Sequence, residues 1–207
     1  MTRRKKPSPL APDRIVDPRL SPKATPRWRG DLPHIFKEGC TYFVTFCLAD
    51  AVPDRHKRRR KIEGSEDSAT IAKHFDVEPS VGGGILKQRN IASMVENALL
   101  YFQGERYAIS AWCVMPNHVH AVVTPFSGHT LSEILHSWKS YSAHEINKSL
   151  RQSGSVWEQE SFDHMVRHER AFEQFVSYTE NNPVAAGLCD RPENWQFSSA
   201  RVRNLRR

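Results

Sequence analysis

Two histidines stand two residues apart in a segment that is otherwise apolar. His118 and His120 follow a turn signal at Pro116-Asn117, and small or β-branched apolar residues alternate with them. In an extended strand, residues i and i+2 project from the same face, so we expect both imidazoles on one side of a strand. The apolar residues between them then face the core, which places the imidazoles on the accessible face.

Adjacent imidazoles are a typical ligand pair for a divalent metal ion. The alternative interpretation is a pair of surface or hydrogen-bonded strand histidines, because a His-x-His motif is short. A metal site therefore requires a third partner from elsewhere in the chain.

A segment near the C-terminus supplies candidates for that partner. The sequence predicts a helix from His168 to Asn181, which ends where Asn182-Pro183 follows because proline cannot continue the hydrogen-bond ladder. Tyr178 and Asn182 lie one turn apart on one flank of the apolar stripe of this helix. If the stripe packs on the sheet, this flank reaches the face that carries the histidines. The stripe consists of Phe172, Phe175, Val176 and Thr179.

The combination of these side chains suits phosphodiester chemistry. The amide oxygen of Asn182 is a ligand for hard cations, and two imidazoles with one amide oxygen leave positions on Mg²⁺ or Mn²⁺ open for phosphate oxygens. The phenol of Tyr178 lies one turn away as a nucleophile. Taken singly, each residue has a simpler interpretation, since asparagine before proline is common in turns and a half-buried tyrosine often has its hydroxyl in water.

The remaining segments predict the scaffold that holds these residues. β-Branched and aromatic residues predict a strand over 41–48, and an apolar stripe predicts a helix over 90–103. A strand over 107–115 pairs with the histidine strand through the tight turn, and a helix runs from 130 or 132 to 150. This order describes an α+β fold with one antiparallel sheet and helices packed on it.

Composition favours a nucleic-acid partner. The chain of 207 residues carries 30 Lys and Arg against 23 Asp and Glu, which gives a net charge of +7 and a pI near 9.4. This excess favours a polyanion, nucleic acid before an acidic membrane. The four cysteines form no C-x-x-C pair and show neither a zinc-ligand spacing nor a disulfide framework. No signal peptide or long apolar run is evident, so we expect a cytoplasmic protein without a membrane partner.

The distribution of charge and proline divides the chain into three regions. Residues 1–38 form a basic, proline-rich arm that is expected to be mostly extended, because it has too little apolar area to offset its ordering entropy. Residues 39–190 carry the histidines and Tyr178, and residues 191–207 form a basic tail. Another basic run is either a solvated surface or a patch that tracks phosphates. Its cations are Arg55, Lys57, Arg58, Arg59, Arg60 and Lys61.

Three motifs stand in order along the chain. They are Met115-Pro116-Asn117-His118-Val119-His120, Tyr178-x-x-x-Asn182-Pro183-Val184 and Trp195-x-x-Ser198-Ser199. In this order and spacing the chain resembles the HUH single-tyrosine transposases, in the subgroup of bacterial REP-associated tyrosine transposases. The similarity runs from about Trp28 to Arg201, and the motifs together are highly specific. Residues 55–84 match no fixed motif of the family.

The resemblance implies a ferredoxin-like HUH fold, with residues 39–190 as the catalytic domain, and a reaction on single-stranded or hairpin DNA of repetitive palindromic elements. Tyr178 would be the nucleophile that forms a 5′-phosphotyrosine, with His118, His120 and Asn182 as ligands of Mg²⁺ or Mn²⁺. The covalent intermediate conserves bond energy for rejoining, so no nucleotide cofactor is required. The implied protein is a nucleoid-associated endonuclease and strand transferase that acts in DNA transposition as a monomer or homodimer.

Alternatives remain for the residues and for the function. Tyr141 is an alternative nucleophile with Glu145 as a metal ligand one turn further, although Tyr141 falls on the apolar stripe of its helix and is expected in the core. Lys139 and Arg167 join the basic run as expected DNA contacts. The other function classes are a hairpin-binding protein of the same fold without catalysis and a metal-dependent hydrolase of small phosphate esters. Binding without nicking would identify the first, and multiple turnovers without Tyr178 would identify the second.

Overall fold

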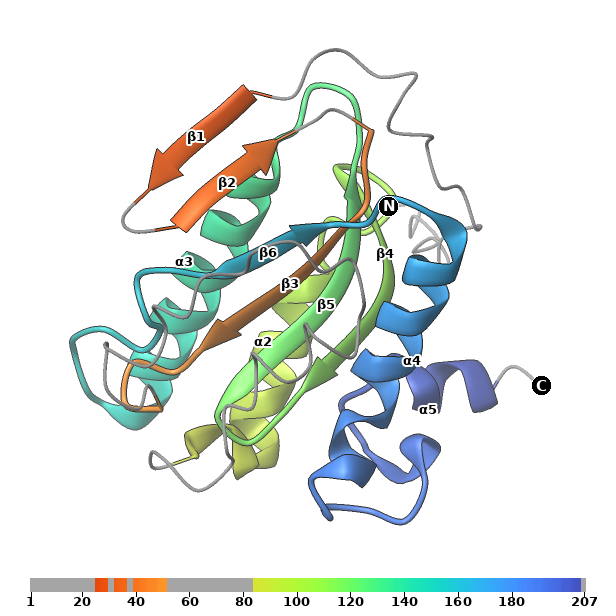
Figure 1. Cartoon of the computed structure of the whole chain (residues 1–207). Helices are drawn as coiled ribbons and strands as arrows, with labels where there is room; N and C mark the ends of the chain where they lie inside the picture. The colour runs from red at the N-terminus through yellow and green to blue at the C-terminus, as the bar shows by residue number, and fades with distance from the viewer. Residues whose placement is uncertain (1–24, 30–31, 37–38, 52–83, 206–207) are drawn as a thin grey trace, which may run out of the picture.

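A four-stranded antiparallel sheet lies at the centre of the computed structural model, with helices on both of its faces (Figure 1). The structure describes residues 25–29, 32–36, 39–51 and 84–205. The strands of this sheet are β3 (Tyr42–Cys47), β4 (Tyr107–Val114), β5 (His118–Pro125) and β6 (Phe162–Met165). The helices are α2 (Arg89–Leu100), α3 (Leu131–Leu150), α4 (Glu169–Ala185) and α5 (Ser199–Asn204), with short 3-10 turns η3 (Ile85–Lys87) and η4 (Pro192–Asn194).

The sheet has the strand order of a ferredoxin-like fold. Its order is β4-β5-β3-β6, and every neighbouring pair is antiparallel. In chain order, α2 lies between β3 and β4, and α3 lies between β5 and β6. The central strands β3 and β5 are almost entirely buried, which suits their β-branched and aromatic residues. The expected α+β fold is therefore confirmed.

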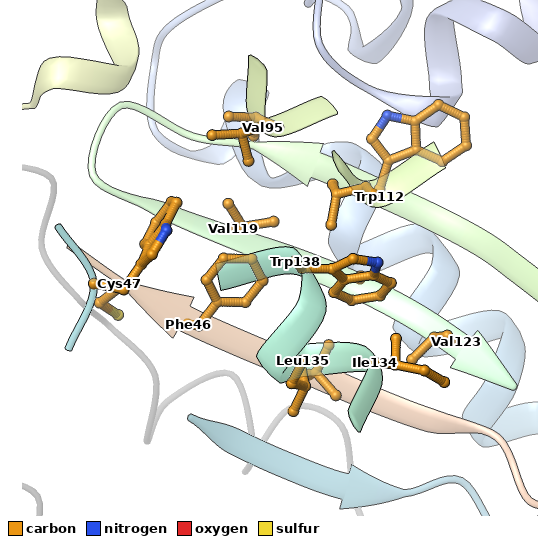
Figure 2. Close-up of a cluster of buried hydrophobic side chains, with 14 of the residues drawn as sticks. Phe46, Cys47, Val95, Trp112, Val119, Val123, Ile134, Leu135 and Trp138 are labelled. Atoms are coloured by element: carbon orange, nitrogen blue, oxygen red, sulfur yellow. The ribbon is translucent and has the colours of Figure 1, made fainter. Parts of the chain in front are cut away.

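One face of the sheet is covered by α2 and α3. Alternate residues of β3 and β5 point to this side, and Phe46 and Val119 pack there near Trp138 of α3 (Figure 2). The ring of Phe46 meets the ring of Trp157 edge to face with 4.9 Å between centroids. The hydroxyl of Tyr107 accepts a hydrogen bond of 2.9 Å from Trp138 Nε1, which satisfies a polar atom in the core.

The opposite face of the sheet is covered by α4. Phe43 of β3 and Val122 of β5 point to this side, and they form a second buried cluster with Phe175 of α4. The rings of Phe43 and Phe175 stack with centroids 4.7 Å apart. Burial of each large apolar side chain contributes about 1.5–3 kcal/mol, so this small cluster is sufficient to seat α4 on the sheet.

The ends of α3 and α4 test the expected helix boundaries. At α3, Thr130 forms the N-cap and exchanges hydrogen bonds with Glu133, as in a capping box. At α4, the expected stop before Pro183 is wrong, because the helix contains Pro183 and extends to Ala185. Proline removes only its own N–H donor, and the ladder resumes when Ala186 N donates to Asn182 O at 3.0 Å.

Two parts of the fold were absent from the sequence-based expectation. Within the arm expected to be mostly extended, β1 (Thr25–Arg29) and β2 (Leu32–Phe36) form an antiparallel hairpin. The strand β6 adds an edge to the sheet beside β3. The rest of the arm and the basic run from Arg55 to Lys61 lie outside the described residues. In the described part of the chain, no helix is long and apolar enough to cross a membrane.

Candidate active site

His118 and His120 lie side by side on the face of the sheet that α4 covers. Their Nε2 atoms are 3.0 Å apart, and their ring centroids are 4.6 Å apart. Two ligand atoms about 2.1 Å from one ion and at right angles to each other are about 3.0 Å apart. The pair therefore has the spacing of neighbouring ligands on a divalent ion, as the alternation of the strand predicts.

The other ring nitrogen of each histidine contacts a polar side chain. Thr45 Oγ1 lies 2.7 Å from His120 Nδ1, and Asn117 Oδ1 lies 2.7 Å from His118 Nδ1. Thr45 is the cross-strand neighbour of His120 in the pairing of β3 with β5. Thr45 and Asn117 were not among the predicted site residues. The location of Asn117 directly before His118 was a signal for Asn117, and the sequence carried no such signal for Thr45.

Burial sets the charge state of the two imidazoles. His118 is 4% exposed and His120 is 1% exposed, so the expectation of an accessible face is wrong, because α4 covers this side of the sheet. Burial lowers the pKa of His118 to about 4, although a hydrogen bond with the Asn182 side chain raises this pKa. Burial and the neighbouring His118 also lower the pKa of His120 well below its ordinary value. Both rings are therefore neutral near pH 7, which is the form that binds a metal.

Tyr178 lies against this pair from the side of α4. Its ring centroid is 5.3 Å from that of His120 and 5.7 Å from that of Phe43. The side chain is half-buried, and the stacked pair of Phe43 and Phe175 fixes the helix one turn before it. The structure thus brings the phenol and the histidines together, as the flank of the α4 stripe predicts.

Asn182 completes the set of polar side chains one turn after Tyr178. Its side chain hydrogen-bonds to His118 and so lies at the edge of the pair. Among the described residues, no group of three His, Cys, Asp or Glu side chains is placed to hold a metal ion. The donor set is therefore two imidazole nitrogens and one amide oxygen, which fits a divalent ion that also takes oxygen ligands from a substrate.

Comparison with known proteins shows which proteins have a similar sequence or fold. The family model described as "Transposase IS200 like" matches residues 86–182, the segment that holds the histidine pair, Tyr178 and Asn182. Over these residues the chain is similar to this transposase family. The match begins in η3 and ends at the last of the predicted site residues.

Two individual proteins are also similar to this chain. The chain is 26% identical over 110 residues to the REP-associated tyrosine transposase of Escherichia coli (strain K12), a match that spans 51% of this chain and 62% of that relative. It therefore spans less than two thirds of the relative's length. A solved structure of a REP-associated tyrosine transposase bound to a REP hairpin covers 86% of this chain and 87% of its own, with a TM-score of 0.60 and 20% identity. The ferredoxin-like transposase fold and the resemblance to the REP-associated subgroup are confirmed.

The structure separates Tyr141 from the histidines. Tyr141 lies on α3, which covers the opposite face of the sheet, and it is 54% exposed. The expectation that Tyr141 belongs to the core is wrong, because the buried stripe of α3 passes through Trp138, Ser142 and Ile146 instead. Glu145 is on the same helix. Neither residue therefore lies near the histidine pair of its own chain.

Two of the expected DNA contacts, Lys139 and Arg167, lie among the described residues. Lys139 Nζ donates to the carbonyl oxygens of Glu158 and Gln159, at 2.7 Å and 3.0 Å, and to Ser161 Oγ at 3.2 Å. The ammonium of Lys139 thus ties α3 to the segment before β6, and a DNA contact for it stays a prediction. Arg167 is exposed just before α4, and its contact with DNA also stays a prediction.

Proposed function

We propose that this protein is a transposase that cleaves and rejoins single-stranded or hairpin DNA through a covalent 5′-phosphotyrosine at Tyr178. The observation that carries the proposal is the approach of the Tyr178 ring to His120, with 5.3 Å between centroids, on the same face where both imidazoles converge. A nucleophile beside a metal ligand pair is the arrangement that phosphodiester transfer requires.

Each residue of the site has its own role in the proposed reaction. His118, His120 and Asn182 would hold Mg²⁺ or Mn²⁺, which when bound draws charge from the scissile phosphate. The Tyr178 oxygen forms a bond to phosphorus as the bond from phosphorus to the 3′-oxygen breaks, and the phenolic proton ends on that 3′-oxygen. The product keeps one phosphodiester, so the reverse reaction joins strands without a nucleotide cofactor.

The DNA partner follows from charge and from the relative's structure. The chain has a net charge of +7, which favours a polyanionic partner. A solved relative with this fold is bound to a REP hairpin, and this supports hairpins of repetitive palindromic elements as the substrate class. We propose that the protein acts at such elements in the cytoplasm. One chain supplies both histidines and Tyr178, so a monomer is sufficient for the chemistry.

The proposal is tested with a hairpin oligonucleotide that carries a single-stranded extension and a label at its 3′ end. A 5′-phosphotyrosine links the protein to the 3′-labelled fragment, so wild type with Mn²⁺ should give a labelled band of protein size on a denaturing gel. Tyr178→Phe should give no such band while binding the hairpin with unchanged affinity. Removal of the metal with EDTA should also abolish the band.

The matched control is Tyr141→Phe, which removes the same hydroxyl from the other face of the sheet and should leave the adduct unchanged. An adduct of normal yield in Tyr178→Phe would contradict the proposal. Tight hairpin binding by wild type without any nicking would favour the alternative function, a hairpin-binding protein that has lost catalysis.

A further inference from the structure

The buried hydroxyl of Thr45 contacts the imidazole that lies closest to Tyr178. Thr45 is 3% exposed, and its Oγ1 lies 2.7 Å from His120 Nδ1 across the pairing of β3 with β5. We propose that Thr45 is a positioning residue of the histidine pair. Its hydroxyl hydrogen-bonds to His120 Nδ1 both with and without a bound divalent ion. This inference rests on the proposed function only in assigning the ion to His118 and His120.

The proton positions on the two rings follow from their partners. A neutral imidazole has one N–H and one lone pair, and an amide oxygen only accepts hydrogen bonds. The proton of His118 therefore lies on Nδ1 and is donated in a hydrogen bond to Asn117 Oδ1, which leaves the lone pair of this ring at Nε2. The 3.0 Å contact between the two Nε2 atoms then requires His120 to donate from its own Nε2. In that state, His120 Nδ1 accepts the hydrogen bond of the Thr45 hydroxyl.

Metal binding reverses the role of Thr45. For both Nε2 lone pairs to face one ion, the proton of His120 must lie at Nδ1, where it donates to Thr45 Oγ1. The proton stays on the same ring, and no proton enters or leaves the protein. A hydroxyl can both donate and accept, whereas an amide oxygen or a hydrocarbon in this position would satisfy only one tautomer or neither. Partners of this kind orient ligand rings, and their removal changes metal affinity by about 10–100-fold.

The chain contains a matched control for this hydroxyl. Thr41 precedes the same strand by one residue, is 2% exposed, and its Oγ1 lies 2.8 Å from Thr124 Oγ1. Thr41→Val and Thr45→Val are the same substitution at two buried hydroxyls, one paired with a hydroxyl and the other with an imidazole. Only Thr45 contacts the histidine pair, so a general loss of strand packing affects both variants and a loss of ring orientation affects one.

The experiment measures Mn²⁺ affinity without DNA, from the electron paramagnetic resonance signal of free Mn²⁺ during a titration at about pH 7.5, where both rings are neutral. Thr45→Val should weaken Mn²⁺ binding by about 10–100-fold. Thr45→Ser, which keeps the hydroxyl, should restore affinity to near wild type, and Thr41→Val should leave it unchanged. Circular dichroism confirms that each variant is folded.

A second measurement needs no substitution. Long-range proton–nitrogen spectra of wild type should show the Nε2–H tautomer of His120 without metal and the Nδ1–H tautomer with saturating Mg²⁺, while His118 keeps its proton at Nδ1. Unchanged Mn²⁺ affinity in Thr45→Val, an equal loss in Thr41→Val, or an unchanged His120 tautomer would overturn the inference.

The outcomes separate this inference from the proposed function. Wild type that binds Mn²⁺ with the expected dependence on Thr45 but forms no DNA adduct would leave the role of Thr45 intact and remove the covalent chemistry. If wild type binds Mn²⁺ no better than a His118→Ala/His120→Ala double variant, the role of Thr45 is overturned. The adduct assay would still test whether Tyr178 is the nucleophile.

Discussion

At the scale of single residues, the site depends on two neutral imidazoles whose Nδ1 atoms contact polar side chains. Asn117 and Thr45 contact their Nδ1 atoms, and Asn182 contacts His118 from α4. The alternation of a strand was sufficient to predict that His118 and His120 share a face. The two partners behind them depend on the register of β3 against β5 and on the shape of a turn, which no spacing in the sequence reports.

Asn182 and its neighbour offer a direct test at this scale. Asn182→Ala removes the hydrogen bond to His118 and the amide oxygen of the donor set. We expect it to weaken Mn²⁺ binding and to slow adduct formation by about 5–30-fold, because one such interaction is worth on the order of 1–2 kcal/mol. The affinity is measured by calorimetric titration and the rate by a time course of the labelled adduct.

Asn181→Ala is the control for this variant. Asn181 is exposed, and its amide donates to the carbonyl oxygen and the hydroxyl of Ser177 within the same helix. Mn²⁺ affinity and adduct rate should therefore stay at wild-type values. Equal effects at Asn181 and Asn182 would show that a general change in α4, and not the amide at the histidines, is responsible.

At the scale of elements, α4 is held from two sides. Phe175 stacks on Phe43 of the sheet, and on another side Glu180 accepts hydrogen bonds from Ser199 and Arg203 of α5. The helix α5 is itself tied to β4, since Trp112 N donates to Ser199 Oγ at 3.1 Å. Figure 1 shows α5 beside α4 at the C-terminal end of the chain. This double attachment fixes the rotation of α4 and with it the direction of Tyr178.

Arg203→Ala tests the attachment of α4 to α5. The change removes the 2.7 Å contact of Arg203 Nε with Glu180 Oε1 and the hydrogen bond from Arg203 to the Ser110 carbonyl oxygen. We expect a loss of about 1–2 kcal/mol in the free energy of unfolding, a modest value because the Arg203 side chain is 37% exposed. Chemical denaturation followed by circular dichroism measures it.

Arg170→Ala is a suitable comparison, because Arg170 is an exposed residue in the first turn of α4. Its free energy of unfolding should change by less than about 0.5 kcal/mol, as for most surface substitutions. If Arg203→Ala is no less stable than Arg170→Ala, the contacts between α4 and α5 do not hold the helix as described.

The elements that were predicted correctly have strong periodic patterns, and the others do not. The strands β3, β4 and β5 and the helices α2 and α3 agree with the predicted segments to within a few residues. The helix α4 passes Pro183 because tertiary packing and the next hydrogen bond outweigh the loss of one donor. The strand β6 has only four residues, and its pairing with β3 defines it. Such a short strand has no recognisable period of its own.

At the scale of the whole molecule, net charge is the property that connects the fold to the proposed DNA partner. The net charge of +7 comes from the whole sequence, and the cations from Arg55 to Lys61 lie outside the described residues. The described site itself holds neutral imidazoles, an amide and a phenol. We therefore expect affinity for DNA to depend on basic residues away from the catalytic groups.

The salt dependence of hairpin affinity tests whether these basic residues bind DNA separately from the histidine site. Replacement of the six cations between Arg55 and Lys61 by glutamine should weaken hairpin binding and flatten the plot of log Kd against log salt concentration, by about 0.7–0.9 for each phosphate that these side chains neutralise in wild type. Fluorescence anisotropy at several salt concentrations measures this slope. At saturating DNA the adduct rate should stay unchanged, and an unchanged slope would show that this run does not bind phosphates.

The most direct test of the central claim is to locate the bond between protein and DNA. Trypsin cleaves after Arg170 and Arg201, but not at Arg191 before Pro192, and the peptide 171–201 contains Tyr178 as its sole tyrosine. Mass spectrometry of the digested adduct should find nucleotides on this peptide. Nucleotides on the peptide 140–148, which carries Tyr141, would contradict the claim that the phenol beside the histidine pair is the nucleophile.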